Sequence, residues 1–236
     1  FLRTPSEITF SPEISTFEER TAFFDTLLDE LLGKGLIEKP RDEYYAIAEN
    51  FGDTPLFKIK RGASPYFGFK NYGLHLNAYV KRPDGLYMWI AKRSGQKNVA
   101  PHKLDQMVAG GQPYGLSIAE NLEKESFEEA HLLPEQLAEA KSVGVLRYRR
   151  QTGYKFRRDY IFTYDLELTD DFLPQNNDGE VDSFQLMSLQ EIISHLEAPD
   201  DFKFNSALVI IDFFIRHGII KPDEPGYFNL TQRLYA

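Results

Sequence analysis

Three glutamates occur at helical spacing in the segment from Gly110 to Leu132, and their chemistry suits a metal ion. If this segment is helical, Glu125, Glu128 and Glu129 fall at positions i, i+3 and i+4, so their carboxylates share one face. Crowded carboxylates repel one another, and beside a buried surface they need either raised pKa values or a bound cation. Hard divalent cations such as Mg²⁺ prefer all-oxygen ligands of this kind.

A helix that begins near Ser117 would position these glutamates. Ser117 with Glu120 three residues later is a capping-box pattern. At about 100° per residue, the apolar side chains gather in one sector: Ile118, Ala119, Leu122, Ala130 and Leu133. Glu129 lies inside this sector and Glu125 borders it, whereas a solvated row of charges would lie opposite. Gly110 and Gly111 precede the helix, and glycines let the backbone approach a phosphate or a metal closely.

The segment resembles the Nudix box, a pattern of Gly, Glu, Arg-Glu, Glu-Glu and Gly positions at fixed spacing. Gly110 takes the place of the first glycine, and Glu125, Glu128 and Glu129 match the later glutamates. The chain departs from the pattern at four positions: Leu116 replaces the first Glu, Lys124 the Arg, Ser126 an aliphatic residue and His131 the closing Gly. A lysine cannot copy the bidentate grip of an arginine on a carboxylate. A left-handed His131 would cost roughly 1–2 kcal/mol, so the helix could instead end differently, with Pro134 enforcing the stop.

Further segments resemble one branch of Nudix hydrolases, which carries an extra N-terminal domain and includes plant and fungal proteins related to thiamin pyrophosphokinase. The similarity covers nearly the whole chain. It rests on residues 41–47, 67–80, 89–97, 178–187 and 207–218. The resemblance implies a pyrophosphohydrolase that uses Mg²⁺ or Mn²⁺ and acts on a small-molecule diphosphate, with thiamin diphosphate and its oxidised forms as candidate substrates.

The resemblance also implies roles for individual residues. The expected metal ligands are Glu125, Glu128 and Glu129, and the expected catalytic residues are Glu125, Glu128, Lys124 and Glu180. The expected substrate-binding residues are Lys92, Arg93, Lys97, Gly110 and Gly111. Glu180 has the alternative role of a turn residue in Asp-Gly-Glu-Val.

Two other functions stay open. The box activates a diphosphate but carries no information about the organic group, so a nucleoside diphosphate or dinucleotide hydrolase is an alternative within enzymes. The departures at Leu116, Lys124 and His131 favour a second alternative, a Nudix-fold ligand-binding module with weakened catalysis.

Composition narrows the class of protein. The formal net charge of −9 disfavours nucleic-acid binding, which depends on phosphate neutralisation. The chain has no cysteine, which excludes disulfides and thiol chemistry and is consistent with the cytoplasm. The longest apolar run, Ala207–Ile215, contains Asp212 and is shorter than the ~20 residues that a membrane span needs. We therefore expect no membrane partner, and the sequence leaves a homodimer open.

The order of elements favours an α/β/α Nudix sandwich with a mixed sheet, in residues 66–236, after a small N-terminal α+β domain in residues 1–65. Apolar spacing predicts a helix over 16–36, and two aromatic runs within 43–60 predict strands. Residues 74–93 form a hairpin pattern around Pro-Asp-Gly, followed by a Gly- and Pro-rich loop and the box helix. Strands are then expected at 143–148 and 155–168, and helices at 137–140, 189–196 and 205–217. His75 alternates away from its leucine neighbours in the first hairpin strand.

Overall fold

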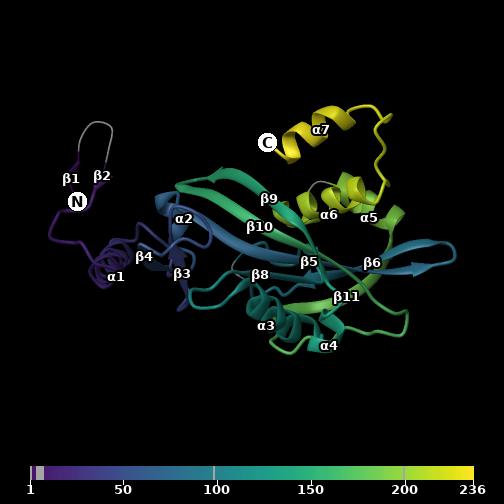
Figure 1. Cartoon of the computed structure of the whole chain (residues 1–236), viewed down its shortest axis with the longest axis horizontal. Helices are drawn as coiled ribbons and strands as arrows, with labels where there is room; N and C mark the ends of the chain where they lie inside the picture. Colours follow the sequence, from purple (N-terminus) through teal and green to yellow (C-terminus); the bar gives the residue numbers. More distant parts are fainter. Residues whose placement is uncertain (1, 4–7, 98, 199) are drawn as a thin grey trace. The chain divides into compact units, whose positions relative to one another are not determined.

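A computed structural model describes residues 2–3, 8–97, 99–198 and 200–236 of the chain (Figure 1). The chain divides into two compact units. Unit 1 contains the chain up to Tyr72, together with Gln112–Gly115 and Arg149–Asp159. Unit 2 contains Gly73–Gly111, Leu116–Tyr148 and Tyr160–Ala236. No helix among the described residues is long and apolar enough to cross a membrane.

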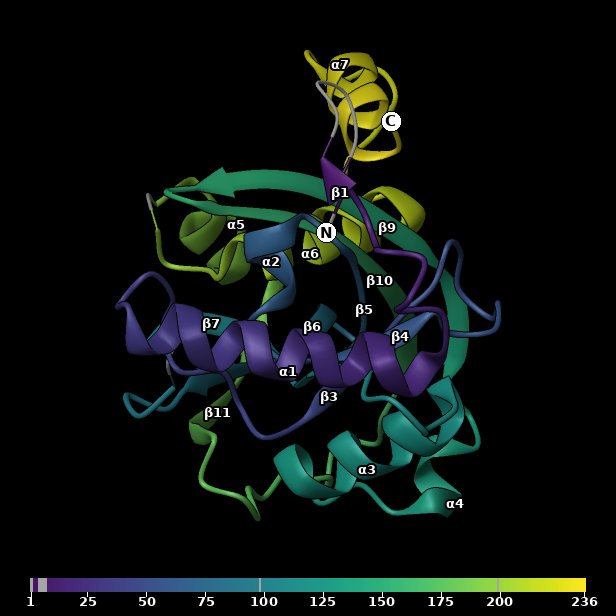
Figure 2. The same ribbon diagram turned by 90° about the vertical axis from the view of Figure 1, so that its left-hand side faces the viewer.

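Unit 1 is built around one long helix and a two-stranded sheet. Its elements are β1 Leu2–Arg3, β2 Ile8–Thr9, α1 Phe17–Gly33, β3 Tyr44–Ile47, β4 Phe57–Lys60 and α2 Ser64–Phe67. A capping box of Thr16 and Glu19 begins α1, the helix that the apolar spacing predicted over 16–36. Helix α1 lies across β3 and β4 (Figure 2), and Phe24 stacks on Phe57 with ring centroids 4.5 Å apart. The expected small α+β unit is therefore present.

The remaining elements begin with the hairpin of β5 Lys70–Arg82 and β6 Gly85–Arg93. The next elements are β7 Leu104–Gln106, β8 Val108–Gly111, α3 Ile118–Ala130, α4 Pro134–Leu137, β9 Lys141–Thr152 and β10 Lys155–Glu167. The chain ends with β11 Val181–Ser188, α5 Leu189–Glu197, α6 Phe204–Arg216 and α7 Tyr227–Leu234. Strands β5, β9 and β10 each contribute residues to both units.

The main sheet has the order β11-β6-β5-β10-β9, with β7 paired to β6 and β8 paired to β5. β6 pairs antiparallel with β5 and with β11. β5 and β10 run in the same direction, because Asn77 bonds to Asp165 and Tyr79 bonds to Glu167 at a constant separation of 88 residues. The sheet is therefore mixed, as expected.

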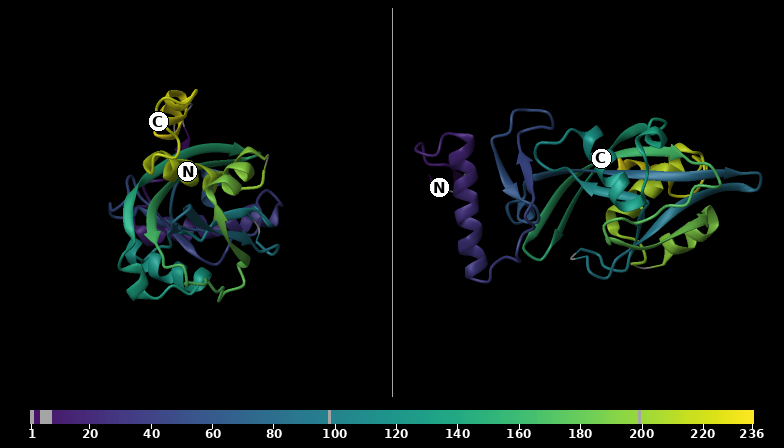
Figure 3. Two further views of the ribbon diagram at one scale, coloured as in Figure 1. Left: turned by 90° about the vertical axis from the view of Figure 1, so that its right-hand side faces the viewer. Right: turned by 90° about the horizontal axis from the view of Figure 1, so that it is seen from below.

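Helices cover both faces of this sheet in unit 2 (Figure 3, left). On one face, Leu122 and Ala130 of α3 pack with Leu74, Leu76 and other strand residues. On the opposite face, Ile192 of α5 and Phe213 of α6 pack with Met88 and Ile90 of β6. Because successive strand residues point to opposite faces, β6 supplies side chains to both cores. This is the predicted α/β/α sandwich.

The structure differs from the sequence prediction at several boundaries. Unit 1 extends to Tyr72 rather than to residue 65, because Phe67 and Phe69 pack against its aromatic core. The short helix α4 covers Pro134–Leu137, whereas it was expected at 137–140. The glycines Gly110 and Gly111 lie in strand β8 rather than in a loop, because they pair with Leu74 and Gly73 of β5.

Candidate active site

Helix α3 carries the three glutamates at different depths. The predicted capping box begins this helix, since Ser117 accepts from the Glu120 amide and Glu120 accepts from the Ser117 amide. The side chains of Glu125 and Glu129 are 9% and 5% exposed, whereas that of Glu128 is 40% exposed. The helix therefore presents one carboxylate to solvent and holds two beneath the surface.

Lys124 joins two of these carboxylates. Its Nζ lies 2.7 Å from Glu128 Oε2 and 3.2 Å from Glu125 Oε1. A single ammonium thus touches both groups, although it cannot grip one carboxylate with a planar fork as arginine does. The departure from the Nudix box at this position preserves the positive charge and its contact with the adjacent glutamate.

Glu129 is the most deeply buried carboxylate of the cluster. Its Oε2 accepts a hydrogen bond from the Ala109 amide at 2.8 Å, and its Oε1 lies 3.4 Å from Lys97 Nζ. Burial raises the pKa of Glu129 to about 7, although Lys97 opposes the shift. Ionised Glu129 therefore needs a nearby cation.

Lys97 connects the helix to a second carboxylate, Glu180. The Lys97 ammonium forms an ion pair with Glu180 as well as with Glu129, and its side chain is only 7% exposed. Burial lowers the pKa of Lys97, against the attraction of Glu129. The structure thus brings together four predicted site residues on α3, the predicted Lys97 and the later segment that carries Glu180.

Gly110 provides the space that Glu125 occupies. A Cβ atom at Gly110 would lie 2.3 Å from Glu125 Cδ and 2.6 Å from its Oε2. Both distances are far below van der Waals contact, so only glycine allows the carboxylate to lie against strand β8 in this position. The lack of a side chain at Gly110 therefore lets the Glu125 carboxylate lie close to the backbone of β8.

The substitution Gly110→Ala is expected to lower hydrolytic turnover about tenfold, because the added methyl displaces the Glu125 carboxylate. The double variant Gly110→Ala/Glu125→Asp should not recover the loss, because the Asp carboxyl carbon takes the place of Glu125 Cγ, which would lie 2.4 Å from the added Cβ. Steady-state kinetics on the three proteins measures this. Wild-type turnover in Gly110→Ala would show that the position of Glu125 does not matter.

Helix α3 ends at a left-handed His131, with φ 53° and ψ 34°. The His131 amide donates to Phe127 O, and the Leu132 amide donates to Ser126 O. The imidazole lies 5.1 Å from the Phe127 ring and its Nδ1 is 2.9 Å from Asn177 Nδ2. These contacts offset the backbone strain that a family glycine would avoid, so the helix ends in the left-handed conformation without glycine.

The variant His131→Ala should lower the free energy of unfolding by about 1 kcal/mol, because it keeps the strained backbone and loses both contacts. His131→Gly also loses the contacts but relieves the strain, so its stability should be close to that of the wild type. Urea unfolding of the three proteins provides the comparison. Equal losses in both variants would mean that backbone strain is unimportant here.

The other predicted substrate-binding residues have different surroundings. Lys92 is exposed, and within the described residues it forms no hydrogen bond or ion pair with the four carboxylates. Arg93 is buried: its guanidinium donates to Val99 O and Ala100 O and to Asp105 Oδ2 at 2.7 Å. Gly111 accepts from Asn121 of α3 through its carbonyl oxygen. Arg93 thus has a place in a buried network rather than on the open side of the site.

The network around Asp105 was not predicted from the sequence. Lys203 lies 2.9 Å from Asp105 Oδ2, and Ser206 donates to the other oxygen. Burial opposes ionisation of Asp105, yet Lys203 and Arg93 hold its pKa below its usual range. No motif surrounds Asp105 in the sequence; the available signal was its position two residues before the apolar pair Met107 and Val108.

The carboxylate cluster fits a divalent cation on chemical grounds. All the donors are carboxylate oxygens, Gly110 leaves room for Glu125, and two lysine ammonium groups lie between the acids as resident cations. Among the described residues no three acidic or histidine side chains already converge as a metal cluster. Each of the two lysines instead contacts a pair of these carboxylates, Lys97 that of Glu129 and Glu180 and Lys124 that of Glu125 and Glu128.

Comparison with known proteins identifies the families that the two parts of the chain match. Residues 72–208 match the model of the NUDIX domain, and residues 1–71 match a domain of unknown function, DUF4743. Nudix hydrolase 24, chloroplastic, from Arabidopsis thaliana is 43% identical over 99% of this chain and 64% of its own length. Nudix hydrolase 20, chloroplastic, from the same plant is 42% identical over 98% of this chain and 62% of its own length. The chain therefore spans slightly less than two thirds of each relative.

Solved structures share the fold at low sequence identity. The protein DR0079 from Deinococcus radiodurans has a TM-score of 0.52 and 19% identity, over 72% of this chain and 98% of its own. A MutT/nudix family protein from Enterococcus faecalis has a TM-score of 0.50 and 11% identity, over 94% of this chain and 81% of its own. With the box glutamates gathered on α3 and the NUDIX match covering more than half of the sequence, the chain belongs to the Nudix hydrolase family.

Proposed function

We propose that this chain is a divalent-metal-dependent pyrophosphohydrolase that cleaves a diphosphate linkage. The observation that carries the proposal is the gathering of four carboxylates from two distant segments. Glu125, Glu128 and Glu129 come from α3, and Glu180 reaches the same cluster through Lys97. Lys97 and Lys124 balance only two of these four negative charges, and the remaining negative charge favours a bound divalent cation.

Glu125, Glu128 and Glu129 are the proposed ligands of Mg²⁺ or Mn²⁺. When bound, the ion would neutralise charge on the diphosphate and make water more acidic. The Ala109 amide orients Glu129 through a hydrogen bond of 2.8 Å, and the missing side chain of Gly110 leaves the space that Glu125 occupies. The chain thus positions two buried ligands through strand β8.

A carboxylate that water can reach is needed to accept a proton. Glu128 and Glu180 have side chains 40% and 33% exposed, so they meet this requirement better than the two buried acids. Because Glu128 is also a proposed metal ligand, we assign this role to Glu180, which would accept the proton as the water oxygen bonds to phosphorus. The bond from that phosphorus to the bridging oxygen breaks, and the departing phosphate takes up the proton.

The substrate class rests on the similarity of several segments to the branch that includes proteins related to thiamin pyrophosphokinase. We propose thiamin diphosphate or its oxidised analogues, which would yield a monophosphate and inorganic phosphate. A nucleoside diphosphate or dinucleotide is the alternative, since the carboxylate cluster acts only on the diphosphate.

A panel of diphosphates tests the proposal: thiamin, oxythiamin, nucleoside, sugar-nucleotide and dinucleotide compounds with Mg²⁺ or Mn²⁺. Phosphate and monophosphate release is measured for wild type and Glu128→Gln. Preferential release from thiamin compounds, lost in the variant, is the expected result. Release from nucleotides alone would overturn the thiamin assignment and would still support metal-dependent hydrolysis of a diphosphate. Metal binding with no release from any compound would favour the ligand-binding module.

A further inference from the structure

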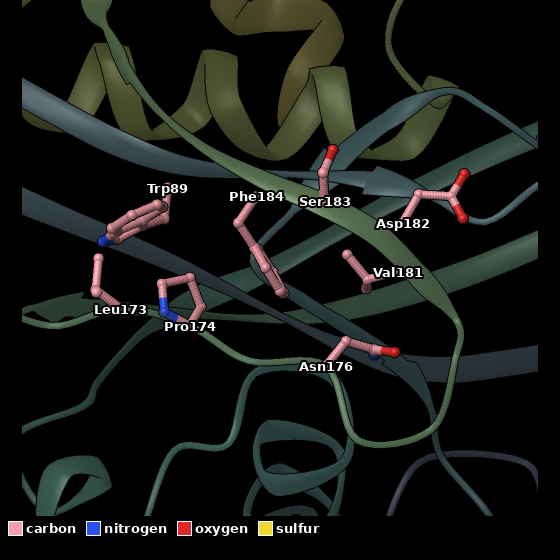
Figure 4. Close-up of a pocket in the computed structure, with 8 residues that line it drawn as sticks. All are labelled: Trp89, Leu173, Pro174, Asn176, Val181, Asp182, Ser183 and Phe184. Atoms are coloured by element: carbon pink, nitrogen blue, oxygen red, sulfur yellow. The ribbon is translucent and has the colours of Figure 1, made fainter.

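Unit 2 contains a cavity of about 340 Å³ that the proposed chemistry does not use. Its size is within the range of small-molecule sites. The lining residues come from β6, β11 and the segment before β11 (Figure 4): Trp89, Leu173, Pro174, Asn176, Val181, Asp182, Ser183 and Phe184. All of them belong to unit 2, and all except Trp89 lie on the part of the chain that leads into and follows Glu180.

Trp89 leaves a hydrogen-bond donor without a partner at this cavity. The residue is only 7% exposed, and its Nε1 is buried with no partner among the described residues. Figure 4 shows this nitrogen at the end of the ring near Leu173. Buried indole N–H groups usually find an acceptor, and leaving one unpaired costs about 1–3 kcal/mol. The donor therefore points to an acceptor supplied by a ligand.

The other walls favour a flat apolar group with a polar edge. Phe184, Pro174 and Val181 provide an aromatic ring and aliphatic surfaces, which suit stacking on a planar ring. Asp182 lies at the opposite end of the displayed row from Trp89 (Figure 4) and is exposed. A carboxylate there would attract a ring that bears an amino group or a positive charge.

The cavity is joined to the carboxylate cluster by a short segment, residues 176–180. Asn176 lines the cavity, and its Nδ2 donates to Glu129 O at 3.4 Å. The Asn177 amide donates to Glu128 O at 2.9 Å, and Glu180 pairs with Lys97. Val181, the next residue, lines the cavity again, and adjacent Cα atoms are about 3.8 Å apart. These contacts are made by the main-chain carbonyls of Glu128 and Glu129, so they hold the cavity wall against the end of α3 that carries the cluster and favour a group tethered to a diphosphate there reaching the cavity.

We propose that this cavity binds the aromatic nitrogen heterocycle of the substrate. The ring stacks on Phe184, accepts a hydrogen bond from Trp89 Nε1 and directs its amino or cationic edge toward Asp182. Its link to a diphosphate rests on the proposed function. Trp89 and Phe184 are then specificity-determining residues. The thiamin rings and a nucleobase share this chemistry, and the experiment distinguishes them.

Trp89 is the only tryptophan of the chain, so intrinsic fluorescence reports on this cavity directly. The whole chain described here is titrated with thiamin monophosphate, with AMP and with a non-aromatic phosphate monoester, under red-edge excitation of the indole. The expected result is saturable quenching by a heterocyclic ligand and none by the non-aromatic ester. Tighter binding of thiamin monophosphate assigns the thiamin rings, and tighter binding of AMP assigns a nucleobase.

Phe184→Leu is the test variant and Phe172→Leu its matched control. Phe172 packs against the same hydrophobic core as Phe184 but does not line the cavity. Phe184→Leu should weaken binding of the heterocyclic ligand about tenfold, which is the typical contribution of one aromatic pair to affinity. Phe172→Leu should leave the affinity within about twofold, and thermal unfolding verifies that both variants fold.

The binding and turnover measurements distinguish a failure of the cavity proposal from a failure of the proposed function. Saturable heterocycle binding without hydrolysis of any diphosphate would support the cavity as a binding site and overturn the proposed function. Hydrolysis of a heterocyclic diphosphate that is unchanged in Phe184→Leu would overturn the cavity proposal and keep the function. Absence of quenching by every heterocycle, or equal weakening in both variants, would also overturn it.

Discussion

The substitution Glu129→Gln is expected to lower metal-dependent turnover about a thousandfold, the order of loss seen when a preorganised charged group is removed from a reaction centre. Glutamine has the same shape and can still accept from the Ala109 amide, which donates to Glu129 Oε2 at 2.8 Å. It lacks the negative charge, and its amide nitrogen would face Lys97. The local fold should persist while the cation loses a ligand. Initial rates with Mg²⁺ or Mn²⁺ measure the loss.

Glu123→Gln is the matched control for this prediction. Glu123 lies on the same helix and is exposed, so the substitution removes the same charge without touching the cluster. Its rate should stay within about twofold of wild type. Isothermal titration with Mn²⁺ should show at least about tenfold weaker binding for Glu129→Gln alone. Equal rates in the two variants would exclude Glu129 from the metal site.

Local rules predicted the helix that carries the site but not its surroundings. The capping box and the spacing of the glutamates identified α3 correctly. The apolar sector was only partly right, because Ala119 and Leu133 are exposed while Asn121 and Ser126 are buried. Helical phase gives the angle between side chains, whereas burial depends on which strands and loops cover them. Those neighbours come from segments far away in the sequence.

The ion pairs of the site also could not be predicted from local sequence rules. Lys97 and Glu180 were both selected as site residues. The residues that surround each of them in the sequence do not indicate that the two side chains would form an ion pair. Their meeting depends on β11 joining β6, where Val181 aligns with Arg93. Strand pairing of this kind is set by the whole sheet and by the turns that connect it. Lys97 and Glu180 could thus be selected one at a time from the sequence, and the ion pair between them could not be predicted.

The alternation of side chains along a strand could have predicted that Arg93 is buried. Trp89, Ala91 and Arg93 are all buried in β6, while Lys92 is exposed. An arginine in register with buried residues needs a partner inside the protein. Asp105 provides it from β7, which was not predicted as a strand. A strand of three residues is too short for its periodicity to be recognised.

His75 is expected to make folding stability depend on pH between about 6.5 and 4. The imidazole is 3% exposed, and burial, with Lys203, lowers its pKa to about 4. Its Nδ1 lies 2.5 Å from Gln106 Oε1 and its Nε2 lies 3.3 Å from Asn205 Nδ2. These partners suit a neutral ring that donates through Nδ1 and accepts at Nε2. A proton on Nε2 would oppose the Asn205 amide.

The sign of this effect follows from proton binding. As the pH falls below about 6.5, the unfolded chain takes up a proton at His75 that the folded protein does not take up until about pH 4. Stability is therefore unaffected above this window and falls by about 3 kcal/mol across it. Above the window, where the ring is neutral in both states, His75 makes no pH-dependent contribution.

Urea unfolding of wild type and His75→Gln at several pH values from about 7 to 4 measures this contribution as a difference in slope. Glutamine does not titrate, so the variant should lose less stability on acidification than wild type, whatever its stability at neutral pH. His195→Gln provides the comparison, because the His195 side chain is 41% exposed and lies outside this network. If wild type and His75→Gln lose stability in parallel from neutral to acid pH, the buried histidine is not the source of acid sensitivity.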